Sequence, residues 1–321
     1  MKILIPDKVN EKATKILEDA GFEVDNKPGI TVEECVKICA DVDAMIVRSG
    51  IKITKEIIDA AKNLKVVVRA GVGYDNIDAE YAASKGVIVE NTPFGNTNAA
   101  AEHTLTLLIL LSKHIIHSHL ELKSGTWDRK KYKATELKDK TLGIIGLGNV
   151  GKKVAKVALA LEMDVLGFDP FIDEEKMKEI GIKKVEFEEL IKNSDYITVH
   201  VPLTEKTKDL ISEKEFSMMK DGVKIVNVAR GGVVNEDDLE NALKSDKVGA
   251  AALDVYSAEP PICKSLIAHD KIICTPHLGA STKEAQINVA LDAASQIVNL
   301  LKEGKIENCV NGVKEIRKKR A

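Results

Sequence analysis

Short apolar runs rich in β-branched residues alternate with segments of helical period along the whole chain. This alternation is typical of parallel sheets whose strands are joined by helical crossovers. In the first part of the chain, strands are predicted at Lys2–Ile5, Ala44–Arg48, Lys65–Arg69 and Val87–Glu90. Helices are predicted between them at Glu11–Ala20, Val32–Ala40, Lys55–Ala61 and Ala79–Lys85. The chain is therefore predicted to be α/β from its first strand onward.

The second part of the chain continues the same alternation. Its strands are predicted at Thr141–Ile145, Asp164–Phe168, Tyr196–Val201, Lys224–Val228, Gly249–Val255 and Lys271–Thr275. Six parallel strands are the number that a doubly wound dinucleotide-binding sheet contains. Two long helical patterns flank this part, at Asn98–Leu122 and Thr282–Glu303. The first is apolar on several faces, so we expect it to be buried between domains or between subunits.

The loop after the first strand of this second part reads Gly146-x-Gly148-x-x-Gly151 and leads into a helical pattern. Gly146 permits a tight turn, Gly148 lets the backbone approach a pyrophosphate, and Gly151 allows the helix to pack closely on the strand. Asp169 ends the next strand and is placed to accept hydrogen bonds from an adenosine ribose. Its carboxylate would repel a 2′-phosphate. The pattern therefore predicts a dinucleotide site that prefers NAD to NADP.

Composition narrows the class of protein and its partners. At roughly 150 residues per domain, the 321 residues indicate two domains. An aromatic content of 4% and a net charge of −3 give no reason to expect a nucleic-acid partner. No apolar run approaches the length of about 18 residues that spans a membrane, and the N-terminus does not resemble a signal peptide. We therefore expect a cytoplasmic protein with no membrane partner.

Neither the cysteines nor the clustered histidines predict a metal site. The five cysteines contain no C-x-x-C pair and are odd in number, which favours reduced thiols. His114, His117 and His119 lie close together, but only the first two have a spacing that converges on one point. No acidic or cysteine ligand completes the shell. A solvated or interface helix face is the favoured interpretation, and no metal is expected.

Three polar side chains follow successive strands near the end of the second part. They are Arg230, Glu259 and His277. Ligands bind at the carboxyl ends of strands in open α/β sheets, so all three should face one crevice. His277 can exchange a proton near neutral pH, and a carboxylate from Glu259 would fix its tautomer. Arg230 can bind a substrate carboxylate bidentately and polarise an adjacent carbonyl.

Together these motifs resemble the D-2-hydroxyacid dehydrogenases over almost the whole chain. The resemblance is carried by the Gly-rich loop with Asp169, Asn227–Gly232, Ala252–Val255, Glu259-Pro260 and Pro276–Gly279. It implies a Rossmann doubly wound parallel sheet inserted into a second, flavodoxin-like α/β domain. On this basis a discontinuous substrate-binding domain is predicted at 1–97 and 289–321, with the NAD-binding Rossmann domain at 98–288. Cys309-Val310, after the last long helix, could return to the first domain as a strand.

The resemblance also implies roles for individual residues. Arg230, Glu259 and His277 would be the catalytic set, with His277 as the acid and base. Cofactor contacts are implied for Val72, Gly146, Gly148, Asn149, Val150, Gly151, Asp169, Val201, Val228, Ala229, Arg230, Asp254, His277, Leu278, Gly279 and Ala280. Asp254 would lie near the nicotinamide carboxamide. Substrate contacts are implied for Arg48, Ser49, Gly71, Val72, Gly73, Arg230 and His277.

Further segments resemble the members of this family that oxidise D-3-phosphoglycerate to 3-phosphohydroxypyruvate in serine biosynthesis. They are Val47–Ser49, Arg69–Asn76, Asn91–Pro93, Trp127–Lys131 and His277–Gln286. A phosphorylated substrate needs additional cations, which Arg48 and the Arg129–Lys131 cluster could supply. The alternative is a reductase of glyoxylate, hydroxypyruvate or another small 2-keto acid. It stays open because the members that oxidise D-3-phosphoglycerate and these reductases share the same catalytic residues.

Two further expectations concern the whole protein. Larger members of the family carry a regulatory domain after the final helix, whereas this sequence ends soon after Glu303, so a short, unregulated form is expected. The apolar helix and the family analogy favour a homodimer. A non-catalytic NAD-sensing or corepressor-like protein is a third hypothesis. It predicts the loss of a catalytic residue or an added interaction tail, and the sequence shows neither.

Overall fold

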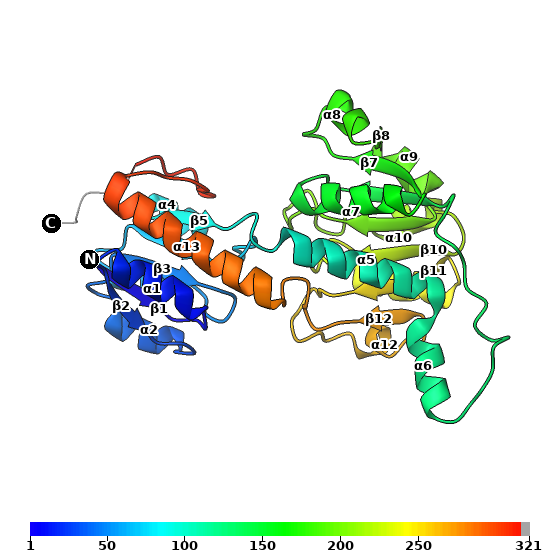
Figure 1. Cartoon of the computed structure of the whole chain (residues 1–321), viewed down its shortest axis with the longest axis horizontal. Helices are drawn as coiled ribbons and strands as arrows, with labels where there is room; N and C mark the ends of the chain where they lie inside the picture. The colour runs from blue at the N-terminus through cyan, green and yellow to red at the C-terminus, as the bar shows by residue number, and fades with distance from the viewer. Residues whose placement is uncertain (316–321) are drawn as a thin grey trace. The chain divides into compact units, whose positions relative to one another are not determined.

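The computed structural model describes residues 1–315 and divides the chain into two units (Figure 1). Unit 1 comprises Met1–Asn96 and Thr282–Ala321, and unit 2 comprises Thr97–Ser281. The last six residues of the predicted substrate-binding domain, 316–321, lie outside the described residues. Unit 2 is thus inserted between two segments of unit 1.

Unit 1 contains a five-stranded parallel sheet of order β2-β1-β3-β4-β5. Its strands are β1 (Lys2–Ile5), β2 (Glu23–Asn26), β3 (Ala44–Val47), β4 (Val66–Arg69) and β5 (Ile88–Asn91). This is the flavodoxin-like order, with its switch point between β1 and β3. Central β3 is buried at every residue, whereas β2 lies at an edge and exposes both of its ends. The sequence pattern missed β2 because an exposed edge strand needs no apolar run.

Five helices complete unit 1: α1 (Glu11–Asp19), α2 (Val32–Ile38), α3 (Lys55–Ala60), α4 (Ala79–Ser84) and α13 (Lys283–Glu303). Helix α13 comes from the C-terminal part of the chain and contacts α1, β3 and β4 (Figure 1). Thr282 begins it, because the Thr282 side chain accepts a hydrogen bond from the backbone N–H of Ala285. The predicted domain boundary at 288/289 is therefore corrected to 281/282, since α13 is unbroken from its cap.

The segment after α13 returns to the sheet of unit 1 at one point. Cys309 forms an isolated antiparallel bridge with Glu90, and the N–H of Val310 donates to the carbonyl of Val89 at 2.9 Å. A strand was predicted here. The structure has one isolated bridge here, because the Asn311 side chain takes the next backbone groups of this edge: its Oδ1 accepts from the N–H of Val89 at 3.2 Å, and its Nδ2 donates to the carbonyl of Val87 at 2.8 Å.

Unit 2 contains a seven-stranded parallel sheet of order β12-β11-β10-β9-β6-β7-β8. Its strands are β6 (Thr141–Ile145), β7 (Asp164–Phe168), β8 (Lys183–Lys184), β9 (Tyr196–Val199), β10 (Val223–Asn227), β11 (Val248–Leu253) and β12 (Ile272–Cys274). Numbered within the unit, this is the 3-2-1-4-5-6 order of the Rossmann fold with one further strand at the β12 edge. The predicted Rossmann fold is confirmed. Strand β8 was not predicted, because two residues are too few to show a pattern.

The sheet of unit 2 is covered by helices on both faces. The helices of unit 2 are α5 (Thr97–Lys113), α6 (Ile115–Lys123), α7 (Asn149–Ala160), α8 (Glu174–Glu179), α9 (Phe187–Asn193), α10 (Glu213–Met218), α11 (Glu236–Lys244) and α12 (Lys264–Ile267). Helices α5 and α7 share one apolar cluster and α9, α10 and α11 the other, whereas α6 has no buried residue. One long helix was predicted over Asn98–Leu122. The structure instead has α5 and α6, bent by 65° at His114, whose backbone is left-handed with φ 52°. A left-handed residue cannot continue a right-handed helix.

Helix α5 packs on α7, β10 and β11 inside unit 2. Leu105, Leu107, Leu108 and Leu111 are buried there. Covering the sheet of unit 2 accounts for these buried residues of α5, and its expected place between domains or subunits stays a prediction. No single helix among residues 1–315 has the length and apolarity to cross a membrane; α5 and α6 pass that test only as a bent pair.

Candidate active site

The Gly-rich loop joins β6 to α7 at the switch point of the sheet, where β6 pairs with β9. Gly146 has φ 90°, and a Cβ there would lie 2.7 Å from the carbonyl oxygen of His200. A Cβ on Gly151 would lie 2.1 Å from the carbonyl oxygen of Gly146. At Gly148, the N-cap of α7, a Cβ would meet no protein atom within 4 Å. The loop is thus closed toward the protein and open at Gly148, as the approach of a pyrophosphate requires.

Asp169 follows β7 and is bound to the Gly-rich loop. Its Oδ2 accepts a hydrogen bond from the N–H of Leu147 at 2.8 Å, and its Oδ1 accepts one from Phe171 at 2.9 Å. Each carboxylate oxygen keeps a second lone pair for a ribose hydroxyl. Asn149 and Val150 are the first residues of α7, and a helix N-terminus favours a bound anion. These residues fit the adenosine and pyrophosphate parts of a dinucleotide.

The loop after β10 is held by the buried side chain of Asn227. Its Nδ2 donates to the carbonyl of Arg230 at 2.9 Å, and its Oδ1 accepts from the N–H of Ala229 at 3.0 Å. The Arg230 guanidinium donates to the carbonyl of Ala229 at 2.6 Å. A Cβ on Gly231 would collide with the backbone of Tyr256, so this loop packs directly on the loop after β11. The half-buried Arg230 is therefore fixed at the carboxyl end of β10.

Glu259 and His277 form a pair: Glu259 lies in the loop after β11, and His277 lies in the loop after β12. Nδ1 of His277 lies 2.7 Å from Oε2 of Glu259. The two side chains are 49% and 40% exposed, so a small molecule can reach them. Because Nδ1 is engaged by the carboxylate, Nε2 is left to exchange a proton with a ligand. The structure thus brings together the two residues that the sequence predicted to act as a unit.

Asp254, at the end of β11, holds the turn that carries His277. Its Oδ1 accepts hydrogen bonds from Thr275 Oγ1 at 2.5 Å and from the N–H of Leu278 at 2.7 Å. Its Oδ2 accepts one from the N–H of Gly279 at 2.7 Å. The N–H of His277 donates to the Asp254 carbonyl at 2.9 Å. Asp254 therefore stabilises this turn through hydrogen bonds within the protein. Its predicted contact with the nicotinamide carboxamide stays a prediction.

Sequence reasoning missed His103 and Thr275. His103 projects from α5, with Nε2 3.1 Å from Thr275 Oγ1 and 3.3 Å from Asp254 Oδ1. Burial acts to raise the pKa of Asp254, but hydrogen bonds from His103, Thr275 and two backbone N–H groups outweigh it and lower the pKa below its usual value. The sequence shows only a histidine in an apolar helix. Its partner Asp254 lies far along the chain, so no local pattern reveals the contact.

The residues expected to contact substrate from unit 1 follow β3 and β4. Arg48 is fixed at the switch point between β1 and β3: its N–H donates to Asp7 Oδ2 at 2.6 Å, and its carbonyl accepts from Asn76 Nδ2 at 2.7 Å. Val72, with Gly71 and Gly73 beside it, follows β4, and its carbonyl accepts from Asn91 Nδ2 at 2.7 Å. Both groups lie at the carboxyl edge of their sheet, where ligands bind in this fold.

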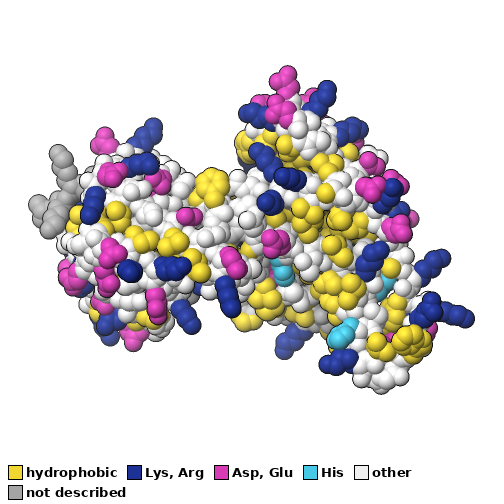
Figure 2. Space-filling model, viewed as in Figure 1, with side chains coloured by type: hydrophobic (Ala, Val, Ile, Leu, Met, Phe, Trp, Pro, Cys, Tyr) yellow, Lys and Arg dark blue, Asp and Glu magenta, His cyan; other side chains and the backbone are white. Residues whose placement is uncertain are grey.

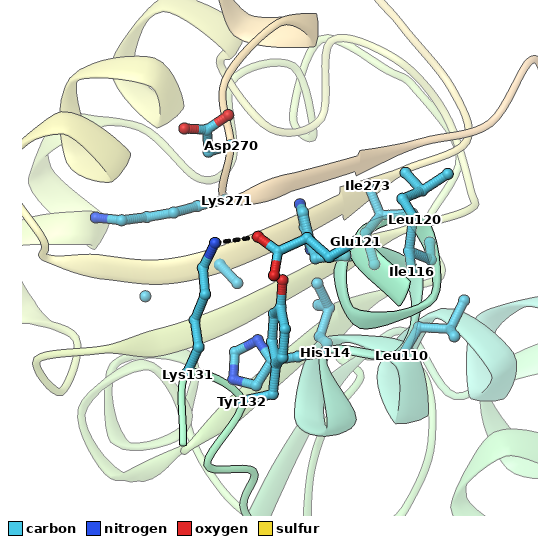
Figure 3. Close-up of a pocket in the computed structure, with 14 residues that line it drawn as sticks. Leu110, His114, Ile116, Leu120, Glu121, Lys131, Tyr132, Asp270, Lys271 and Ile273 are labelled. Atoms are coloured by element: carbon cyan, nitrogen blue, oxygen red, sulfur yellow. Dashed lines mark hydrogen bonds and ion pairs between the residues drawn. The ribbon is translucent and has the colours of Figure 1, made fainter. Parts of the chain in front are cut away.

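The Arg129–Lys131 cluster lies elsewhere in unit 2. Lys131 forms an ion pair with Glu121 of α6 and lines a pocket together with Gly249, at the start of β11, and Lys271, just before β12 (Figure 3). These positions belong to the amino edge of the sheet, whereas His277 lies beyond the carboxyl edge. Within one chain, the cluster therefore does not join Arg230, Glu259 and His277.

A doubly wound sheet with this Gly-rich loop, an acid after the next strand and a Glu–His pair at the carboxyl edge defines a dinucleotide-binding domain of the dehydrogenase class. Residues 105–279 match the family described as D-isomer specific 2-hydroxyacid dehydrogenase, NAD binding domain. The chain belongs to this family, as its motifs predicted. When NAD is bound, its nicotinamide supplies the acceptor for a hydride.

Curated relatives extend the similarity to nearly the full chain. D-3-phosphoglycerate dehydrogenase of Archaeoglobus fulgidus is 46% identical over 312 residues, which are 97% of this chain and 59% of that protein. D-3-phosphoglycerate dehydrogenase of Rattus norvegicus is 44% identical over 310 residues, which are 97% of this chain and 58% of that protein. The chain thus spans somewhat more than half the length of these relatives.

Solved structures share the fold at lower identity. A glyoxylate reductase from Paecilomyes thermophila is 29% identical with a TM-score of 0.90, and the match covers 97% of this chain and 98% of that one. A D-lactate dehydrogenase from Aquifex aeolicus, complexed with NAD and lactic acid, is 28% identical with a TM-score of 0.84, over 97% of this chain and 99% of that one.

Proposed function

We propose that the protein catalyses the NAD-dependent oxidation of D-3-phosphoglycerate to 3-phosphohydroxypyruvate. The observation that carries the proposal is the hydrogen bond of 2.7 Å between His277 Nδ1 and Glu259 Oε2, on the sheet that also bears the Gly-rich loop. With NAD bound as the hydride acceptor, Nε2 of His277 would take up the hydroxyl proton of the substrate. Glu259 stabilises the imidazolium that forms, and in the reverse direction His277 returns the proton to the keto acid.

Arg230 binds the carboxylate of the substrate. Its guanidinium is permanently charged and presents paired donors, which match a carboxylate bidentately. Asn227 holds the main chain on both sides of it, through Ala229 and Arg230 itself. In this role Arg230 orients the hydroxyl-bearing carbon and polarises the carbonyl that forms. NAD is the proposed form of the cofactor, because the Asp169 carboxylate would repel a 2′-phosphate.

The phosphate of the substrate calls for cations beyond Arg230. Arg48 supplies one, together with Ser49 and the backbone of Gly71–Gly73. The Arg48 main chain is fixed on both sides, and its Nε is a buried donor with no hydrogen-bond partner among the described residues. A guanidinium with spare donors suits a phosphate or carboxylate. Relatives named D-3-phosphoglycerate dehydrogenase, at 44 to 46% identity, support the choice of substrate.

The protein also acts as a homodimer in this proposal. Large apolar side chains are exposed over α6 and the segment after it: Ile115 48%, Leu120 60%, Leu122 54% and Trp127 76%. Figure 2 shows apolar side chains gathered in this region. Beside them lies a pocket of about 450 Å³ between α5, α6, Tyr132 and the start of β11 (Figure 3). A protruding apolar patch next to a hollow is what a self-complementary interface needs.

A reductase of glyoxylate, hydroxypyruvate or another small 2-keto acid is the second candidate. The observation that favours it is the TM-score of 0.90 with a glyoxylate reductase, since the Glu–His pair and the arginine serve either direction of the reaction. The two candidates differ in whether a phosphate is required.

Purified protein with NAD tests the proposal through the absorbance of NADH. Formation of NADH from D-3-phosphoglycerate, and not from the L-isomer, supports it. Oxidation of NADH by glyoxylate or hydroxypyruvate, without any reaction of phosphoglycerate, establishes the alternative. No turnover with any 2-hydroxy or 2-keto acid would refute both.

A further inference from the structure

Helix α5 reaches the candidate active site through the side chain of His103. Its Nε2 lies 3.1 Å from Thr275 Oγ1 and 3.3 Å from Asp254 Oδ1. Thr275 Oγ1 in turn lies 2.5 Å from the same Asp254 oxygen. Asp254 is fully buried and the His103 side chain is 19% exposed, so these contacts lie largely away from water. Three side chains from α5, β11 and the end of β12 thus form one polar cluster.

The chemistry of the cluster fixes which atoms donate. Asp254 is held in its charged form by the hydrogen bonds it receives, so its Oδ1 can only accept. The Thr275 hydroxyl donates to it, which leaves the Thr275 oxygen as an acceptor. Nε2 of His103 must therefore carry a hydrogen and is a donor to both neighbours. Removing this donor would leave a buried carboxylate with one hydrogen bond too few.

What the cluster supports is the conformation of His277. The backbone of His277 is left-handed, with φ 54°, a conformation that a non-glycine residue keeps only when its surroundings enforce it. The enforcing contacts come from Asp254, whose carbonyl binds the N–H of His277 and whose carboxylate binds the N–H groups of Leu278 and Gly279. His103 is thus two contacts away from the proton-transferring imidazole.

We propose that His103 is a positioning residue, whose Nε2–H holds Asp254 and Thr275 so that the 275–279 turn keeps His277 paired with Glu259. The inference rests on the proposed function, because it assigns His277 the proton transfer. The hydrogen bonds of His103 reach Asp254 and Thr275, so its effect on His277 is transmitted through them. It lies on α5 and follows no predicted strand, which is why the pattern of strand-end residues does not include it.

Two substitutions of His103 separate this role from simple packing. His103→Leu keeps the bulk and removes the donor, whereas His103→Gln returns an amide N–H at similar reach. Thr104→Val is the matched control, because Thr104 is buried on the same helix and its hydroxyl donates to the carbonyl of Ala100 within α5, at 2.8 Å. We expect kcat to fall about tenfold or more in His103→Leu, to stay within about threefold of the parent in His103→Gln, and to be unchanged in Thr104→Val. The Kd for NADH should change less than kcat does.

A second readout does not depend on turnover. The hydrogen-bonded Nδ1–H of His277 should give a downfield proton NMR signal, assigned by its absence in His277→Asn. It should persist in His103→Gln and be lost or broadened in His103→Leu. Retention of this signal and of kcat in a folded His103→Leu, or equal losses in Gln and Leu variants, would overturn the inference. An inactive parent protein would contradict the proposed function instead, and the NMR comparison would still decide the role of His103.

Discussion

At the scale of single residues, the candidate site depends on a histidine in an uncommon backbone conformation. His277 has φ 54°, and the carbonyl and carboxylate of Asp254 hold the turn around it. Such a conformation is costly for a non-glycine residue and persists only where the surroundings enforce it. The hydrogen bond to Glu259 then leaves Nε2 as the atom available to a substrate.

Replacing His277 by Asn tests its assignment. We expect kcat to fall roughly 100-fold or more, because Asn cannot take up the proton, while the Kd for NADH stays nearly the same. Steady-state kinetics and a fluorescence titration with NADH measure the two quantities. Normal turnover in this variant would show that another group transfers the proton.

The residues proposed to contact a ligand were easier to bring together from the sequence than the residues that hold them in place. Arg230, Glu259 and His277 each follow a strand with a clear apolar pattern, so their common edge follows from parallel topology. His103 and Thr275 gave no such signal, because their meeting depends on the packing of α5 against β11. Spacing along a sequence does not report contacts made through tertiary packing.

At the scale of secondary-structure elements, the Gly-rich turn between β6 and α7 offers a matched pair of substitutions. Gly148→Ala adds a Cβ in open space, so the fold should keep its Tm while the affinity for NADH falls about tenfold or more. Gly151→Ala places a Cβ 2.1 Å from the Gly146 carbonyl oxygen, so its Tm should fall as well. Thermal unfolding and NADH titration distinguish them. Tight binding by Gly148→Ala would mean that the pyrophosphate does not approach this residue.

Strand β5 contains a buried acid, Glu90. Burial raises its pKa to about 7, although the N–H of Glu307 donates to its Oε1 at 2.8 Å. The folded state therefore keeps a proton that an unfolded Glu loses near its ordinary value of 4.5. The resulting stabilisation is complete below about pH 4.5 and is lost as the pH rises toward about 7. His200 acts in the opposite sense, because burial lowers its pKa from 6.5 to about 4. Stability therefore falls as the pH drops from about 6.5 toward about 4, where the unfolded histidine takes up a proton that the folded one does not.

Glu90→Gln isolates the contribution of Glu90, because His200 is the same in both proteins. Gln is neutral at every pH, so the Tm of the variant minus that of the parent should increase between about pH 5 and about pH 8. Thermal unfolding followed by circular dichroism measures the difference. A difference independent of pH would show that Glu90 does not titrate across this range.

The elements missed by sequence reasoning share a physical cause. Strand β2 is an exposed edge and β8 has two residues, so neither needs an apolar run. The break between α5 and α6 falls at His114, and apolar residues continue on both sides of it, so the pattern shows no end. Apolar periodicity reports burial, and it is silent where an element is exposed, short or interrupted by backbone geometry.

At the scale of the whole molecule, the inserted arrangement of the two units was predictable from the mid-chain position of the Gly-rich loop. The exact boundary was not, because α13 has the same helical pattern on both sides of residue 288. Only packing shows that the helix belongs to unit 1 from Thr282 onward.

The homodimer is tested by charging its proposed interface. Leu122→Asp and Trp127→Asp place a carboxylate among the exposed apolar side chains near α6, so they should convert the dimer into a monomer of 35.0 kDa. Light scattering coupled to gel filtration measures the mass. Phe171→Asp, at a side chain that is 93% exposed elsewhere in unit 2, is the control and should remain dimeric. A parent protein that is itself monomeric would contradict the proposal.

The most direct measurement of the proposed function is the ratio of kcat/KM for D-3-phosphoglycerate to that for D-glycerate, with NAD as the cofactor. The two substrates differ only in the phosphate. If Arg48 and its neighbours bind the phosphate, the ratio should be about 100 or more, since an ion pair with a bidentate guanidinium contributes a few kcal/mol. A ratio near one would contradict oxidation of phosphoglycerate as the function.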